Sequence, residues 1–192
     1  MPLPLRPLLL LAALLTFQVV QAGVTPPARE LGLAPDLLNG TQRALISKEA
    51  PRGSVIVFLS AKCPCSRSHE KVLSELALTY GPRGFHFTGV VSNADEDEAA
   101  ARTHFTEAKL PFPILRDASA RIADALGANR TPHAFVLSPA GELLFQGGVD
   151  DAKDASKAQR SYLREALEQV SHGKAPEVRE ARSLGCRIQR PE

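Results

Sequence analysis

The sequence predicts an α/β fold in which a central mixed β-sheet is flanked by helices. Short apolar runs alternate with amphipathic stretches of helical period along residues 53–172. The early strands are each followed by a helix, and since such crossovers are right-handed, these strands are expected to be parallel neighbours. The last two strands flank the turn sequence Ser-Pro-Ala-Gly at 138–141, which predicts an antiparallel hairpin.

The first strand is expected at residues 55–59, which read Val-Ile-Val-Phe-Leu. A continuous apolar run rich in β-branched residues is typical of a strand buried on both faces. Before it, residues 23–52 contain several Pro and Gly residues and predict mostly loop, with one short amphipathic helix at 41–48. After it, residues 66–80 predict a helix, because apolar side chains recur every three or four positions and Gly81 follows directly.

The middle of the chain continues the alternation. A strand is expected at 85–91 and a helix at 95–108, which opens with four consecutive acidic residues. Acidic side chains favour a helix N-terminus through the helix dipole, so we interpret them as a solvated first turn. A short apolar segment at 114–115 then precedes a helix at 118–126.

The last third predicts the hairpin, a helix and a tail. Strands are expected at 133–137 and 142–146, and the final helix at 156–170. The remaining residues are polar except for one apolar segment at 184–188, Leu-Gly-Cys-Arg-Ile. A tail that met only solvent would not need these apolar residues.

The first 22 residues have the composition of a secretory signal peptide. Arg6 is the single charge before the Leu- and Ala-rich run, and Val20-Gln21-Ala22 places small residues at the cleavage positions. Export predicts a periplasmic or secreted protein with no membrane attachment after cleavage. We therefore expect a signal peptide, an N-terminal extension, one domain and a C-terminal tail that carries Cys186, at residues 1–22, 23–52, 53–172 and 173–192.

Composition and charge exclude several classes of protein. Hydrophobic residues make up 44% of the 192 residues, which excludes a mainly disordered chain. The net charge is only +2, and no stripe of Lys or Arg and no aromatic platform indicates a nucleic-acid partner. Three cysteines are too few for a disulfide-stapled domain; outside the cytoplasm they allow one internal disulfide and leave one thiol.

Cys63-Pro64-Cys65 lies where the first buried strand is expected to meet the first long helix. A cysteine at such a junction faces unpaired backbone N–H groups and the positive end of the helix dipole. Both favour the thiolate, so the pKa of Cys63 should lie below that of a free cysteine. Because the thiolate is the nucleophile, the sequence predicts a redox-active sulfur here.

Three features carry a family resemblance: Phe58 to Cys63 at a strand end, Thr131-Pro132 before a strand, and the hairpin at 138–142. With them the chain resembles the thioredoxin superfamily, and more narrowly exported redoxin-domain proteins of the alkyl hydroperoxide reductase/thiol-specific antioxidant type. The resemblance covers residues 53–170, and it extends to the Gly-Cys segment of the tail. It implies a thioredoxin-like fold, Cys63 as the attacking cysteine, and a cis peptide at Thr131-Pro132 with Pro132 shaping the substrate groove.

The motif departs from both well-known subfamilies. The thioredoxin motif is Cys-x-x-Cys, whereas here Ser66 stands where the second cysteine would be and Cys65 comes one residue early. A peroxiredoxin motif is Pro-x-x-x-Thr/Ser-x-x-Cys; Ser60 fills its hydroxyl position, but Ile56 replaces its Pro. Disulfide exchange and peroxide reduction therefore both remain open.

Three cysteines allow three pairs. A Cys63–Cys186 disulfide would make Cys186 the resolving cysteine and bring the tail over the site. A Cys63–Cys65 disulfide would close a tight, strained ring, which suits an oxidising catalyst. A Cys65–Cys186 disulfide would be a structural clamp that leaves Cys63 free.

The favoured function is an extracytoplasmic thiol-disulfide oxidoreductase with Cys63 as nucleophile and Cys65 or Cys186 as resolving thiol. It would act on a protein dithiol or disulfide, exchange electrons with an extracytoplasmic redox partner, and need no cofactor. One alternative is a peroxiredoxin-like thiol peroxidase that reduces peroxide. Others are a copper-binding redox chaperone with Cys63, Cys65 and His133 as ligands, and a redox-inactive binding module.

The remaining histidines and acidic residues are interpreted as solvated. This applies to His69 on the outer face of the first long helix, to His86 and His104, and to the loop residues Asp150 and Asp151.

Overall fold

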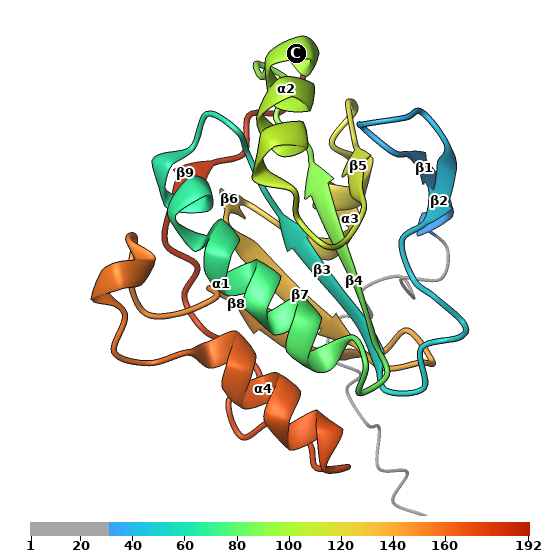
Figure 1. Ribbon diagram of the computed structural model, residues 1–192, viewed down its shortest axis with the longest axis vertical. Coiled ribbons are helices and arrows are strands. Elements are labelled where there is room, and N and C mark those ends of the chain that lie inside the picture. The colour runs from blue at the N-terminus through green and yellow to red at the C-terminus, as the bar shows by residue number, and fades with distance from the viewer. Residues whose placement is uncertain (1–30) are drawn as a thin grey trace, which may run out of the picture.

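The structure is a computed structural model that describes residues 31–192 (Figure 1). The expected signal peptide lies outside the described residues, as do residues 23–30 of the extension. The central sheet has five strands in the order β5-β4-β3-β7-β8. Its first three members are parallel to one another, β7 is antiparallel to β3, and β8 is antiparallel to β7 and so runs in the direction of the first three, which confirms the mixed sheet. Their bounds are Ile114–Arg116 (β5), Phe85–Val91 (β4), Gly53–Phe58 (β3), His133–Leu137 (β7) and Leu143–Gly147 (β8).

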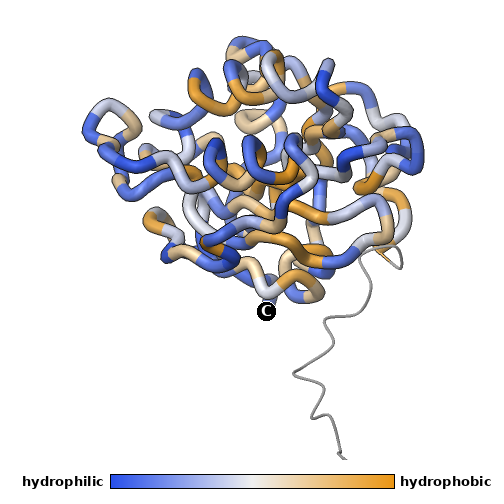
Figure 2. The backbone as a smooth tube through the Cα atoms, turned by 90° about the horizontal axis from the view of Figure 1, so that it is seen from below, coloured by the Kyte–Doolittle hydropathy of each residue, from blue (hydrophilic) through white to orange (hydrophobic). Residues whose placement is uncertain are grey.

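Helices cover both faces of this sheet. One face packs against α1 (Pro64–Tyr80), α2 (Glu98–Ala108) and α4 (Tyr162–Ser171), and the other against α3 (Arg121–Leu126). Successive side chains of a strand point to opposite faces, so Val55 enters the first core and Ile56 the second. Every residue of β3 is buried, as the apolar run predicted. Hydrophobic segments run through the middle of the molecule in Figure 2, while hydrophilic ones lie on outer loops.

The expected helix at 41–48 is wrong. Residues Gln42–Ala44 form a strand, β2, which pairs with β1 (Leu33–Pro35) in a small antiparallel sheet. Gly40, with φ +75°, turns the chain between them, and the Asp36 carboxylate accepts a hydrogen bond from Arg43 Nε at 2.8 Å. An eight-residue amphipathic stretch cannot sustain a helix in water without tertiary packing, and the pairing with β1 prevails.

Three helices begin later than their patterns predict, because acidic side chains bind the free N–H groups. Asp97 caps α2, so the helix begins at Glu98 instead of Asp95. Asp117 accepts hydrogen bonds from the first N–H groups of α3. Residues 155–157 form a separate 3-10 turn, η2 (Ala155–Lys157), and the Asp151 carboxylate then accepts hydrogen bonds from the N–H groups of Gln159 and Arg160 before α4 begins.

The C-terminal tail is part of the fold. Its strand β9 (Cys186–Arg187) pairs antiparallel with β6 (Arg130–Thr131), immediately before β7. Ile188 is only 3% exposed, so the apolar segment of the tail packs as its composition suggested. Arg190 donates hydrogen bonds to the Asp124 carboxylate and the Ala128 carbonyl, and it anchors the end of the tail. Within residues 31–192, no helix has the length and apolar character that a membrane span requires.

Candidate functional site

Cys63 is the N-cap residue of α1. Its Sγ accepts a hydrogen bond from the backbone N–H of Ser66 at 3.5 Å, and Pro64 occupies the first helical position. The side chain is only 1% exposed. The N-terminus of a helix carries unpaired N–H groups and a partial positive charge, so this position stabilises a negatively charged sulfur.

The register of β3 and β7 brings the second part of the site to Cys63. Phe58 pairs with His133, so the loop after β3 lies beside the residues that precede β7. The Thr131–Pro132 peptide bond is cis, as the resemblance implied. The Thr131 carbonyl lies 3.2 Å from Cys63 Sγ and accepts the thiol hydrogen bond.

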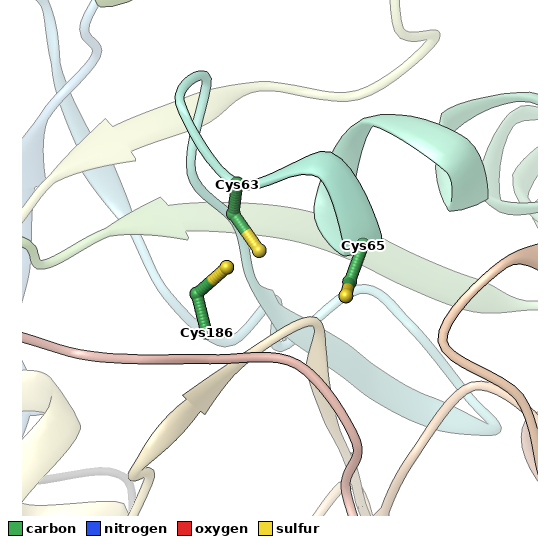
Figure 3. A group of neighbouring side chains, drawn as sticks. All are labelled: Cys63, Cys65 and Cys186. Atoms are coloured by element: carbon green, nitrogen blue, oxygen red, sulfur yellow. The ribbon is translucent and has the colours of Figure 1, made fainter.

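The tail brings the third cysteine. Thr131 pairs directly with Cys186, so the strand β9 places Cys186 over the sulfur of Cys63. The sulfur atoms of Cys63, Cys65 and Cys186 all lie within 4.8 Å of one another, and all three are free thiols. Figure 3 shows the sulfurs of Cys63 and Cys186 directed toward each other, one from the helix start and one from the tail.

Electrostatics distinguish the three thiols. Burial by itself raises the pKa of Cys63, but the neighbouring Cys186 thiol, the Thr131 side chain and the backbone N–H groups of Ser66 and Cys186 outweigh burial and lower it. Burial and the neighbouring Cys63 sulfur raise the pKa of Cys186 to about 12. The same two influences raise the pKa of Cys65, against a smaller opposing effect of Lys153. Cys63 is therefore the thiol most readily ionised, and Cys186 holds its proton and donates it as a hydrogen bond.

Two serines shape the loop around Cys63. The Ser66 hydroxyl accepts a hydrogen bond from the backbone N–H of Ser60 at 3.0 Å, and the Ser60 carbonyl accepts one from the N–H of Cys63. Ser66, at the position of the second thioredoxin cysteine, thus has a structural contact. The Ser60 hydroxyl is buried and has no hydrogen-bond partner among the described residues. Its contribution to the loop is made by its backbone.

The interpretation of His69 and Asp150 as solvated is wrong. His69 is 1% exposed and Asp150 3% exposed, and Nε2 of the histidine lies 3.0 Å from Oδ1 of the aspartate. The other ring nitrogen lies 2.6 Å from the carbonyl oxygen of Cys65. The pair therefore joins the first turns of α1 to the loop after β8. Local sequence patterns did not predict this contact, because the two residues are 81 positions apart and meet only when the loop folds over α1.

The acidic run before α2 is also only partly solvated. Glu96 is buried, where its carboxylate accepts hydrogen bonds from the Ala61 N–H and from Asn93. This carboxylate holds the loop between β3 and Cys63 against the start of α2. On the same loop, Lys62 forms an ion pair with Asp95.

His133 does not join the sulfur cluster. Its ring is tilted against the ring of Phe135, with 4.4 Å between the ring centroids, and Phe135 belongs to the core on the far face of the sheet from α1. Burial lowers the pKa of His133 to about 4. The group of possible metal ligands in the described residues instead contains Cys186 as the third member.

The sequence and the structure of this chain both resemble those of known proteins. The sequence profile of the Redoxin family matches residues 27–162. The chain belongs to the Redoxin family. No curated protein sequence matches this redoxin.

Several solved structures are similar to this redoxin. An uncharacterized conserved protein from Geobacillus kaustophilus matches with a TM-score of 0.75 and 23% identity over 82% of this chain and 87% of that one. A hypothetical protein from Sinorhizobium meliloti 1021 matches with a TM-score of 0.74 and 26% identity, over 83% and 90% of the two chains. A secreted Mycobacterium tuberculosis disulfide oxidoreductase homologous to E. coli DsbE matches with a TM-score of 0.50 and 20% identity, over 60% and 81%. These likenesses confirm the thioredoxin-like fold.

Proposed function

We propose that this redoxin is an extracytoplasmic thiol-disulfide oxidoreductase in which Cys63 is the nucleophile and Cys186 the resolving thiol. The observation that carries the proposal is the contact between a buried sulfur of lowered pKa and a second thiol that remains protonated. The attacking cysteine must be a thiolate, and the thiol that resolves the mixed disulfide must lie near it and stay protonated until the mixed disulfide has formed. Cys65, within 4.8 Å of both sulfurs, is the alternative resolving thiol.

The reaction has two exchanges. The Cys63 thiolate attacks one sulfur of a substrate disulfide, forms a mixed disulfide and expels the other substrate sulfur as a thiolate. Cys186 then loses its proton and attacks Cys63 Sγ, which releases the second substrate thiol and leaves a Cys63–Cys186 disulfide. Run in reverse, the same steps oxidise a substrate dithiol. Thr131, whose carbonyl lies 3.2 Å from the sulfur, and Pro132, which follows it through the cis peptide bond, would position the substrate.

The compartment and partners belong to the same proposal. The Leu- and Ala-rich sequence at 1–22 supports export to the periplasm or the medium, and the extension, domain and tail would begin at residues 23, 53 and 173. The substrate would be a protein dithiol or disulfide, and a second extracytoplasmic redox protein would restore the starting state.

The test is disulfide exchange by the protein prepared from residue 23 onward. The reduced protein is mixed with glutathione disulfide, and the products are mapped by mass spectrometry over time. We expect a Cys63–Cys186 disulfide, no reaction with Cys63→Ser, and a trapped glutathione adduct on Cys63 with Cys186→Ser. If the adduct accumulates with Cys65→Ser instead, Cys65 is the resolving thiol; if Cys63 reacts no faster than a free cysteine, the proposal fails.

The burial of Cys63 favours thiol peroxidase activity as a second candidate function. With a 1% exposed side chain beneath β9, the Cys63 sulfur is more accessible to a hydroperoxide than to a folded protein. The Cys63 thiolate would attack the peroxide, form a sulfenic acid and release water or an alcohol. Attack by Cys186 would then form the disulfide and release a second water. Stopped-flow oxidation by one equivalent of hydrogen peroxide tests this: a rate no greater than that of a free thiolate excludes it.

A further inference from the structure

A single disulfide uses two sulfur atoms, yet three converge at the start of α1. Cys65 could point to solvent from the first turn of the helix, but its Sγ lies within 4.8 Å of the sulfurs of both Cys63 and Cys186. Figure 3 shows that the three side chains come from two segments, Cys63 and Cys65 from the helix start and Cys186 from the tail. Neither exchange nor peroxide reduction requires the third sulfur in this place.

We propose that the reduced protein binds one Cu(I) ion through Cys63, Cys65 and Cys186. Three sulfurs each about 2.3 Å from a metal at the centre of their triangle are separated by about 4.0 Å. The sulfurs of this cluster, within 4.8 Å of one another, therefore need to approach by about 0.8 Å at most to reach that geometry. Changes in side-chain torsion suffice for this, since each sulfur is a single bond from its Cβ.

The set of three sulfur ligands favours Cu(I) over harder cations and over Zn(II), which takes four ligands at a structural site. Within the described part of the chain, the cluster consists of three sulfurs, and no histidine or carboxylate joins it. Soft thiolates select soft cations such as Cu(I), whereas Zn(II) at a structural site takes four ligands. His133, which the sequence suggested as a ligand, packs against Phe135 instead. Cys186 takes its place.

The surroundings suit the charge of the complex. Three thiolates and one Cu(I) ion carry a net charge of −2. The N-terminus of α1, which Cys63 caps, contributes a partial positive charge, and Lys153 contributes a full one near Cys65. Binding releases the protons of the thiols, so the affinity should fall as the pH falls.

Redox chemistry at the same sulfurs would control the metal. When a substrate disulfide accepts two electrons from the thiolates of Cys63 and Cys186, these two sulfurs form a disulfide and the substrate leaves as two thiolates, which take up protons from water. Only Cys65 then remains as a thiolate ligand. The ion keeps its Cu(I) state and dissociates, so the site is occupied in the reduced protein and empty in the oxidised one.

The test is an anaerobic titration of the fully reduced protein, from residue 23 onward, with Cu(I) held in competition with bathocuproine disulfonate. We expect one equivalent of Cu(I) bound, with three sulfur neighbours in X-ray absorption. Cys65→Ser and Cys186→Ser should each weaken binding more than about 100-fold, since loss of a mere supporting partner around a metal costs 10–100-fold. His133→Asn and His172→Asn are the controls, for the ligand suggested by the sequence and for an exposed histidine, and both should bind as the parent does.

Several outcomes would overturn the inference: no binding, a Cys65→Ser variant that binds as tightly as the parent, or copper retained after Cys63 and Cys186 are oxidised. Disulfide exchange with glutathione disulfide, measured on the same sample without copper, tests the proposed function separately. A protein that exchanges disulfides but binds no Cu(I) refutes only the metal site. One that binds Cu(I) through three sulfurs but does not exchange refutes only the oxidoreductase.

Discussion

The hydrogen bond from Cys186 to Cys63 should control the reactivity of the site. Burial, the strongest single influence, raises the pKa of Cys63, and the Cys186 thiol is the strongest of the influences that lower it. A hydrogen bond to a charged group contributes about 1.5–3 kcal/mol, and one pKa unit corresponds to about 1.4 kcal/mol. Removing this donor should therefore raise the pKa of Cys63 and slow its reaction at neutral pH by about 10-fold to 100-fold.

Two variants with a single thiol isolate this effect. Cys65→Ser/Cys186→Ala leaves Cys63 without the donor, whereas Cys65→Ser/Cys186→Ser provides a hydroxyl in its place. The tail should stay in position in both, because Ile188 is buried and Arg190 anchors the segment beyond it. The pKa is read from thiolate absorbance near 240 nm and from the pH dependence of alkylation by iodoacetamide.

We expect Cys63 to titrate at higher pH in the Ala variant than in the Ser variant. If both variants titrate at the same pH, the Cys186 side chain does not lower the pKa of Cys63, and the Thr131 side chain and the backbone N–H groups of Ser66 and Cys186 account for any depression. Equal alkylation rates over the whole pH range would refute the reasoning in the same way.

Three further predictions concern stability. Gly185→Ala should destabilise the tail by about 2–3 kcal/mol in urea unfolding and expose Cys186 to alkylation. The reason is that φ of Gly185 is +150° and a Cβ there would lie 2.0 Å from the Thr131 carbonyl oxygen. An unchanged rate of Cys186 alkylation would contradict this prediction. Asp150→Asn should cost about 1.5–3 kcal/mol by weakening the buried contact with His69, whereas the exposed Asp151→Asn is the matched control and should cost under about 1 kcal/mol. Burial lowers the pKa of His133 in the folded protein to about 4, so the unfolded chain binds this proton more readily. The free energy of unfolding should therefore fall by up to about 3 kcal/mol as the pH drops from about 6.5 toward 4. The His133→Asn variant should show a weaker dependence on pH.

Local sequence patterns predicted the parts of the site that depend on chain neighbours. The apolar run ending at Phe58, followed by Cys63 and Pro64, predicts a strand, a cysteine and a helix start in that order. The structure has Cys63 as the N-cap of α1, with its pKa lowered as expected. These features follow from the period of the hydrophobic residues and from helix capping. Both depend on residues a few positions apart, so one amino-acid sequence is enough to predict them.

Long-range contacts account for what the patterns missed. His69 has the spacing of a surface residue on α1, and only the loop that carries Asp150 buries it. Glu96 resembles its solvated neighbours, yet it accepts a hydrogen bond from the loop before Cys63. The short segment at 41–48 has helical spacing, but a turn at Gly40 and a partner strand override it.

By itself the sequence determined the α/β alternation, the mixed sheet and the position of a cysteine at a helix start, because hydrophobic period and helix capping are local properties. It left three cysteine pairs open and suggested His133 as the third metal ligand. Only the tertiary structure placed Cys186 and excluded His133 from the cluster, because the pairing of β9 with β6 joins residues 55 positions apart in the sequence. Such a pairing depends on which strand edge is free once the domain has folded, and local sequence patterns do not predict which edge that is.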